Sequence, residues 1–122
     1  MTTYGPYTSV RQAGNLLFVS GQIGINPATK QAAAGIEEQT TQALANLATT
    51  LKSAGSKLSD VVKTTVFLVD MNDFAVMNAV YENAFPVPRP ARSAVGVREL
   101  PRIAGTAKLL VEIEAVAHME QL

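Results

Sequence analysis

The spacing of hydrophobic residues changes along the chain between a period of two, typical of strands, and a helical period of 3.6. Alternating or β-branched runs predict five strands, at 7–12, 16–20, 61–69, 92–98 and 109–117. Apolar stripes predict two helices, one from Ile36 to Leu51 and one that runs from a cap at Asp73 to Ala84. The predicted order is therefore ββαβαββ, an α+β arrangement.

The segments between these elements carry residues that favour turns and helix ends. These are Gly14-Asn15 between the first two strands, Asn26-Pro27 in a loop at 21–35, Gly55 as a C-terminal helix cap, and Pro86, Pro88 and Pro90 after the second helix. Each falls where the hydrophobic period changes, which supports the predicted boundaries.

The residue pattern of the last strand predicts which face of the sheet is apolar and which is mixed. Side chains along this strand alternate between the two faces of the sheet. One face receives Leu109, Val111, Ile113, Ala115 and Ala117, and the other receives Leu110, Glu112, Glu114 and Val116. Two helices can cover only one face of the sheet, so the second face, with its mixture of carboxylates and apolar residues, is left over. It is either a subunit interface that holds polar pockets or a face open to solvent, and the pattern favours neither.

Composition narrows the class of protein. A chain of 122 residues with 48% hydrophobic and 16% charged residues is predicted to form one globular domain, 1–122. The formal net charge of zero argues against nucleic acid as a partner, because phosphate contacts require a basic excess. Without cysteine or a ligand spacing signature, no metal is expected. Apolar runs are too short to span a bilayer and no secretory signal is recognisable, so a cytoplasmic protein without membrane contact is expected.

Few residues suggest chemistry by themselves. Ser20-Gly21-Gln22 ends a predicted strand, either as a plain turn or as a point of close backbone approach. Asn78 lies in the second helix, and Arg92 follows a rigid proline-rich approach, where its guanidinium could grip a carboxylate with two hydrogen bonds. The alternative for Arg92 is a structural ion pair with Glu112. The only histidine, His118, is interpreted as a surface residue rather than a general base.

A series of motifs in constant order covers almost the whole chain. They are Gly5-Pro6-Tyr7, Gly14-Asn15, Ser20-Gly21-Gln22, the stretch 60–68, Met71-Asn72-Asp73-Phe74 with Asn78 and Tyr81, Pro90-Ala91-Arg92-Ser93, and the stretch 111–115. This series resembles the reactive-intermediate deaminase (RidA) family. The resemblance implies a chorismate-mutase-like fold, with a mixed sheet that carries both helices on one face. It also implies a homotrimer with active sites between subunits.

The implied activity is the hydrolysis of imines such as 2-iminopropanoate and 2-iminobutanoate, which arise from 2-aminoacrylate and related enamines, to 2-keto acids and ammonia, without a cofactor. Arg92 would bind the substrate carboxylate and Glu112 would position or activate the attacking water. The resemblance assigns the pocket lining to Tyr7, Ser20, Gly21, Gln22, Asn78 and Ala94. The chemistry agrees with these roles, because an imine is already electrophilic and needs only positioning and acid–base assistance.

Two features depart from the family pattern. Many members carry a cysteine at the position of Ala94, so regulation through that thiol is excluded here, while activity is expected to survive if water is the nucleophile. The connection 100–108 is longer than usual and is expected to extend the turn before the last strand and to reshape the rim of the site.

Two other functions stay open from the sequence. One is a non-catalytic small-metabolite sensor that uses the same Arg92 pocket, which a turnover assay would separate from an enzyme. The other is an RNA-directed translation inhibitor or endoribonuclease, which the zero net charge disfavours.

Overall fold

A computed structural model describes residues 3–119. The strands are β1 (Val10–Ala13), β2 (Leu16–Ile23), β3 (Val61–Leu68), β4 (Ala91–Gly96) and β5 (Val111–His118). The helices are α1 (Gly35–Ser53) and α2 (Phe74–Ala84), with short 3-10 turns before β3 and before α2. The predicted order ββαβαββ is confirmed.

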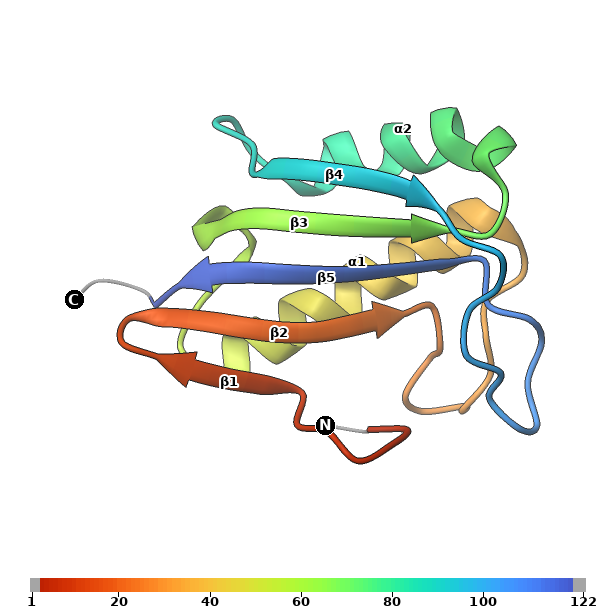
Figure 1. The fold of residues 1–122 in the computed structure, drawn as a ribbon, viewed down its shortest axis with the longest axis horizontal. Coiled ribbons are helices and arrows are strands. Elements are labelled where there is room, and N and C mark those ends of the chain that lie inside the picture. Colours follow the sequence, from red (N-terminus) through yellow and green to blue (C-terminus); the bar gives the residue numbers. More distant parts are fainter. Residues whose placement is uncertain (1–2, 120–122) are drawn as a thin grey trace.

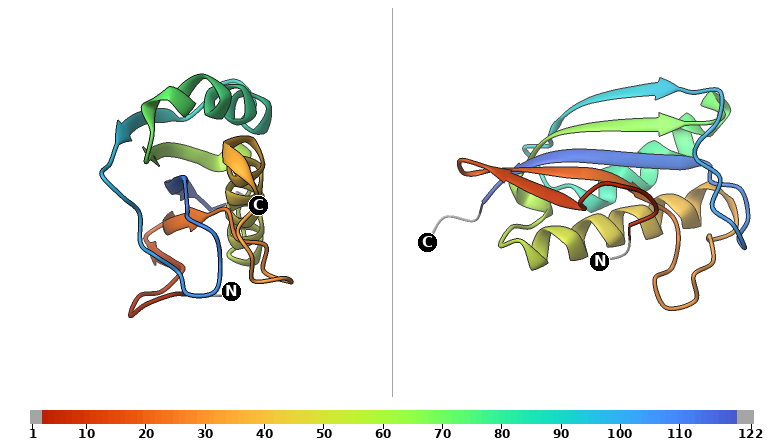
Figure 2. Two further views of the ribbon diagram at one scale, coloured as in Figure 1. Left: turned by 90° about the vertical axis from the view of Figure 1, so that its right-hand side faces the viewer. Right: turned by 60° about the horizontal axis from the view of Figure 1, so that its bottom comes forward.

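The five strands form one mixed sheet in the order β1-β2-β5-β3-β4. β3 and β4 are parallel and are joined through α2, whereas the other neighbours are antiparallel. Both helices lie on the same face of the sheet (Figures 1 and 2). This arrangement confirms the prediction of a mixed sheet covered on one side.

The main hydrophobic core lies between the sheet and the helices. On β5 the buried residues alternate as predicted, and the α1 stripe packs against them. The core residues of these two elements are Val111, Ile113, Ala115, Ala117, Ala43, Leu44, Leu47 and Leu51. On α2, Met77 and Tyr81 are buried, but Val76 is 42% exposed, so the inclusion of Val76 in the apolar stripe predicted for this helix, together with Met77, Val80, Tyr81 and Ala84, was wrong.

Several predicted boundaries need correction. The first strand begins at Val10 and not at residue 7, because the chain bends at Gly5–Tyr7, where the Tyr7 amide donates to the Gly5 carbonyl. β2 continues through 21–23, which was expected to be loop. β4 starts at Ala91 and ends at Gly96, two residues before the predicted end.

Helix ends follow the predictions in part. Gly55 takes a positive φ of 85° after α1, which suits the cap position expected there. Asp73 occupies the N-cap position of α2, but its side chain makes no capping hydrogen bond. The carboxylate of Asp70 accepts from the Asn72 amide instead, within the turn that precedes the helix. The predicted capping role of Asp73 was therefore wrong.

The long connection between β4 and β5 folds over one end of the uncovered face. Leu100 and Leu109 are buried there in a second cluster, together with Ile23 and Ile25. Leu109 thus lies outside β5 and outside the main core, contrary to the alternation predicted from 109. The buried Gln39 holds the connection, because its amide donates to the Lys108 carbonyl and accepts from the Leu110 amide.

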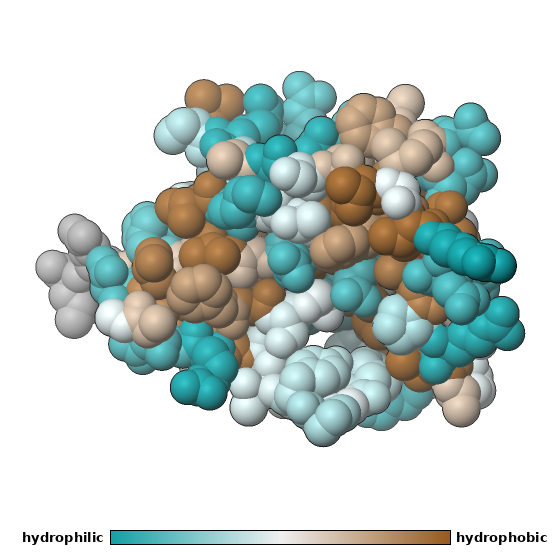
Figure 3. All heavy atoms as spheres, in the orientation of Figure 1, coloured by the Kyte–Doolittle hydropathy of each residue, from teal (hydrophilic) through white to brown (hydrophobic). Residues whose placement is uncertain are grey.

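The rest of the uncovered face carries apolar side chains among polar ones (Figure 3). Phe18 is 48% exposed and Val95 is 41% exposed, on strands near opposite edges of the sheet. Glu114 lies between them on β5. Large exposed apolar side chains among polar ones keep the prediction of a subunit interface open.

Candidate functional site

Arg92 lies on the edge strand β4 and points toward α2. Its Nη1 donates a 2.7 Å hydrogen bond to Oδ1 of Asn78. The guanidinium carbon lies 4.8 Å from the ring centroid of Tyr81 and 5.6 Å from that of Phe74. A guanidinium has five N–H donors, and the Asn78 bond is the only hydrogen bond that Arg92 makes within residues 3–119. Arg92 and Asn78, both predicted for the site, are therefore brought together with donors left for a ligand.

Strand register separates Arg92 from Glu112. Arg92 pairs with Thr64, which pairs with Ala115, so all three side chains are on the helix-covered face. Glu112 is three residues from Ala115 and points to the opposite face, beside Phe67. The structural ion pair considered from the sequence does not form within the chain.

Glu112 is partly buried and lies against β2. Burial, and secondarily the charge of Glu114, raise the pKa of the Glu112 carboxyl above its ordinary value of 4.5. A Cβ placed on Gly21 would lie 2.6 Å from the Glu112 Cδ and 2.7 Å from its Cγ. Gly21 therefore lacks a side chain where the Glu112 carboxylate crosses β2, which agrees with the close backbone approach considered from the sequence and identifies Glu112 as the group that approaches.

Ser20 and Gly21 form a bulge inside β2 rather than the end of a strand. Val19 pairs with Ala115 and Gln22 pairs with Ile113, so two residues of β2 face the single residue Glu114. The hydroxyl of Ser20 donates to the Thr8 carbonyl at 2.6 Å, which ties the bulge to the segment before β1.

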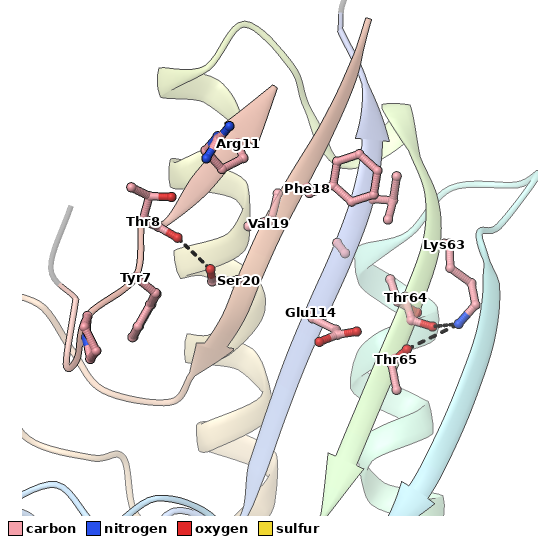
Figure 4. A pocket seen from close by; sticks show the side chains of 13 residues that line it. Tyr7, Thr8, Arg11, Phe18, Val19, Ser20, Lys63, Thr64, Thr65 and Glu114 are labelled. Atoms are coloured by element: carbon pink, nitrogen blue, oxygen red, sulfur yellow. Dashed lines mark hydrogen bonds between the residues drawn. The ribbon is translucent and has the colours of Figure 1, made fainter. Parts of the chain in front are cut away.

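Two cavities lie on either side of this bulge. The larger, of about 760 Å³, is an open hollow whose lining includes Tyr7, Ser20 and Glu114 (Figure 4). The smaller, of about 260 Å³, lies toward α1 and is lined in part by Tyr7, Gly21 and Gln22. The amide of Gln22 donates to the Ser20 carbonyl at 3.1 Å. Tyr7 separates the two cavities, and both are large enough for a small metabolite.

Ala94 lies two residues after Arg92 on the same face of β4. It pairs with Val66 and packs against the main core. Position 94 thus carries a small side chain on the strand of Arg92, packed against the main core.

The predicted site residues therefore fall into two groups within one chain. The Arg92 group is at the β4 edge and contains Arg92, Asn78 and Ala94; the Glu112 group is near the β1–β2 side and contains Tyr7, Ser20, Gly21, Gln22 and Glu112. Arg92 is on β4 and Glu112 is on the central strand β5, two strand spacings or roughly 10 Å apart, and their side chains point to opposite faces of the sheet. One chain does not bring the two groups into one pocket.

The remaining candidates lie elsewhere. His118 is at the end of β5, with its Nε2 3.6 Å from Oδ1 of the mostly buried Asp60. Within residues 3–119 no group of three or more His, Asp or Glu could hold a metal ion, and no helix is long and apolar enough to cross a membrane. The fold and the two groups define an α+β protein with metabolite-sized cavities along its sheet.

Comparisons with known proteins give the family. The family model described as Endoribonuclease L-PSP matches residues 1–119. A RutC family protein of Pyrococcus horikoshii is 49% identical over 117 residues, covering 95% of this chain and 89% of the relative. The 2-iminobutanoate/2-iminopropanoate deaminase of Escherichia coli is 43% identical over 116 residues, covering 93% and 87%. The crystal structure of RidA from an Antarctic Psychrobacter species superimposes with a TM-score of 0.90 at 36% identity, covering 97% and 92%. The chain belongs to the RidA family, as the resemblance predicted.

Proposed function

We propose that the protein hydrolyses imines of small 2-keto acids, such as 2-iminopropanoate and 2-iminobutanoate, to the keto acid and ammonia. The observation that carries this proposal is the Arg92 guanidinium, held by Asn78 with further donors available at the sheet edge. A planar fork of this kind suits a carboxylate, which every 2-imino acid carries. Support also comes from the relative at 43% identity that is named a 2-iminobutanoate/2-iminopropanoate deaminase.

The complete site is proposed to form between subunits. Arg92 lies at the β4 edge, whereas the Glu112 group lies on β5 and β2, toward the other side of the sheet, so the β4 edge of one chain would meet the β1–β2 side of the next. A contact between two different surfaces is heterologous, and it builds a closed ring or an open filament rather than a twofold dimer. The resemblance to RidA implies a ring of three. The exposed Phe18 and Val95 would then become buried.

The assembly can be measured directly. Light scattering at micromolar concentration is expected to give three times the chain mass. A monomer mass would contradict a site shared between subunits, and a dimer would contradict the ring.

The proposed reaction needs one water and no external oxidant or reductant. Arg92 binds the carboxylate of the protonated imine, and Glu112 accepts a proton from water as the water oxygen bonds to the imine carbon and the C=N π pair moves to nitrogen. Glu112 then returns this proton to the nitrogen of the carbinolamine. The C–N bond breaks as the hydroxyl oxygen forms the C=O bond, ammonia leaves, and the hydroxyl proton passes to solvent or to ammonia. The raised pKa of Glu112 suits a group that first accepts and then donates a proton. Tyr7 and Ser20 would shape the pocket around the substrate.

A coupled assay tests the proposal. A serine or threonine dehydratase generates the unstable imine, and the rate of keto acid appearance is followed with and without the protein. Faster appearance supports hydrolysis. An unchanged rate together with measurable binding of 2-oxobutanoate would indicate a metabolite sensor instead. An RNA-cleaving activity, suggested by the family description, has less support because the net charge of the chain is zero.

Gly21→Ala is expected to slow hydrolysis on the order of 10²-fold while the fold is kept, because the new methyl group forces the Glu112 carboxylate to move. Gly96→Ala is the matched control. Gly96 ends β4, away from Glu112, and its methyl group would also meet a flexible side chain, that of Met71 in the 3-10 turn before α2. Rate and melting temperature are measured for both variants. Equal rates for the parent and Gly21→Ala would show that the position of Glu112 is not critical.

Ala94→Cys is expected to leave the rate nearly unchanged, because in the proposed reaction water is the nucleophile. The added sulfur would lie against the main core, where Ala94 packs. Steady-state rates of the variant and the parent, measured under reducing conditions, test this point. A large gain in rate would show that a thiol at this position takes part in the chemistry.

A further inference from the structure

Three side chains of α2 surround the guanidinium of Arg92. Phe74, Asn78 and Tyr81 are four and three residues apart, so they occupy one face of the helix. Asn78 holds Nη1 at 2.7 Å, while the two rings lie at 5.6 Å and 4.8 Å from the guanidinium carbon. Together they hold the guanidinium between a hydrogen-bond acceptor and two aromatic rings. From the sequence, Tyr81 was counted among the residues that carry the family resemblance but was given no role in the site.

The Tyr81 ring is itself fixed from the sheet. Its hydroxyl lies 2.6 Å from Oγ1 of Thr64, and Thr64 is fully buried while Tyr81 is 4% exposed. The ring of Phe85 packs against Tyr81 with the centroids 4.5 Å apart. Burial raises the pKa of the Tyr81 hydroxyl, so the phenol stays neutral in this contact. A rigid aromatic surface therefore lies beside the flexible arginine side chain.

We propose that Tyr81, assisted by Phe74, is a positioning residue that holds the Arg92 guanidinium in the orientation that binds the substrate carboxylate. This role rests on the proposed function of Arg92. A guanidinium on a long side chain samples many rotamers, and its apparent affinity falls in proportion to the fraction of time it spends in the competent one. The stack against the rings raises that fraction before the ligand arrives.

The proposal predicts a particular division of kinetic effects. Tyr81→Leu is expected to weaken inhibition by 2-oxobutanoate and to raise KM, each by about tenfold, while kcat changes little, because the bound carboxylate itself holds the guanidinium. Tyr81→Phe keeps the ring and is expected to retain the parent KM. A merely structural role would instead lower the concentration of active enzyme, reducing kcat at constant KM.

A double-mutant cycle identifies the residue through which Tyr81 acts. In an Arg92→Lys background the planar stack is already lost, so Tyr81→Leu is expected to weaken 2-oxobutanoate binding far less than it does in the parent. Phe74→Leu, at a partly buried position, gives a second test if Tyr81→Leu folds poorly. The proposal would be overturned if the losses of 2-oxobutanoate binding free energy from Tyr81→Leu and Arg92→Lys were fully additive. It would also be overturned if the Tyr81→Leu and Phe74→Leu variants both bound 2-oxobutanoate with the parent affinity.

A measurement without turnover separates this proposal from the proposed function. The Arg92 Nε–H signal in NMR spectra is expected to be displaced by the ring currents of its two aromatic neighbours, and to stay displaced in Tyr81→Phe. In Tyr81→Leu it is expected to move toward the position of a solvent-exposed arginine. If these shifts occur but the parent hydrolyses no imine, the proposed function fails and the positioning role stands. If the Arg92 signal is the same in Tyr81→Leu as in the parent, the positioning role fails even in an active enzyme.

Discussion

Arg92→Ala is expected to abolish nearly all imine hydrolysis while leaving the fold intact. Two charge-assisted hydrogen bonds to a carboxylate are worth about 1.5–3 kcal/mol each, so their loss lowers kcat/KM on the order of 10²- to 10⁴-fold. Arg92→Lys keeps the charge but loses the planar fork, so it is also expected to lose most activity. Steady-state kinetics on the coupled assay measure both variants.

Melting temperature completes this test. The structure shows no Arg92–Glu112 pair within residues 3–119, so removing Arg92 leaves no carboxylate without a partner. Only the stack on Phe74 and Tyr81 and the bond to Asn78 are lost, at a cost of about 1–2 kcal/mol. A drop in melting temperature large enough to explain the whole loss of activity would therefore contradict the role in binding.

Arg89→Ala is the matched control for this variant. Arg89 precedes the same strand and forms an exposed ion pair with Glu82 at 3.8 Å, which contributes little to stability. Normal turnover is expected. A loss comparable to that of Arg92→Ala would indicate that the positive charge of the region, and not the geometry of Arg92, supports activity.

The element order was predictable because it follows from the hydrophobic period. The buried positions of β5 and of α1 recur at the spacing that one covered face imposes, and the structure confirms them. Strand ends were less predictable. Ser20-Gly21 looked like a turn, whereas it is a bulge that lets β2 continue to Ile23. Serine and glycine favour both structures, and only the pairing with β5 decides between them.

The division of the candidate site between the β4 edge and the β5–β2 part of the sheet could not be predicted from the chain pattern. The resemblance supplied Arg92 and Glu112 as partners in one site, but it carried no information on which face each side chain occupies. That depends on the register of β4 against β3 and of β3 against β5. The reason for Gly21 is a three-dimensional contact with Glu112, from a strand 90 residues further along the chain, that no local pattern contains.

Glu112→Gln is expected to slow hydrolysis by about 10²- to 10⁴-fold, the range for a positioned acid–base group, without weakening 2-oxobutanoate binding. The amide keeps the shape of the side chain over Gly21 but cannot accept a proton. The parent kcat/KM should also rise with pH through the pKa of Glu112, which lies above 4.5, because the carboxylate is the base. The variant should lack this rise.

Stability gives an independent check of the same substitution. Because burial raises the pKa of Glu112 in the folded state, the unfolded chain ionises first as the pH rises from 4.5, and this group lowers the stability of the folded protein across that window. Glutamine removes this effect, so Glu112→Gln should melt no lower than the parent at neutral pH.

Glu114→Gln is the matched control, because Glu114 is an exposed carboxylate two residues along the same strand. It is expected to keep most activity and to bring the pKa of Glu112 closer to 4.5, since its charge contributes to the shift. Parent-like turnover in Glu112→Gln, with the larger loss in Glu114→Gln, would transfer the acid–base role from Glu112 to Glu114.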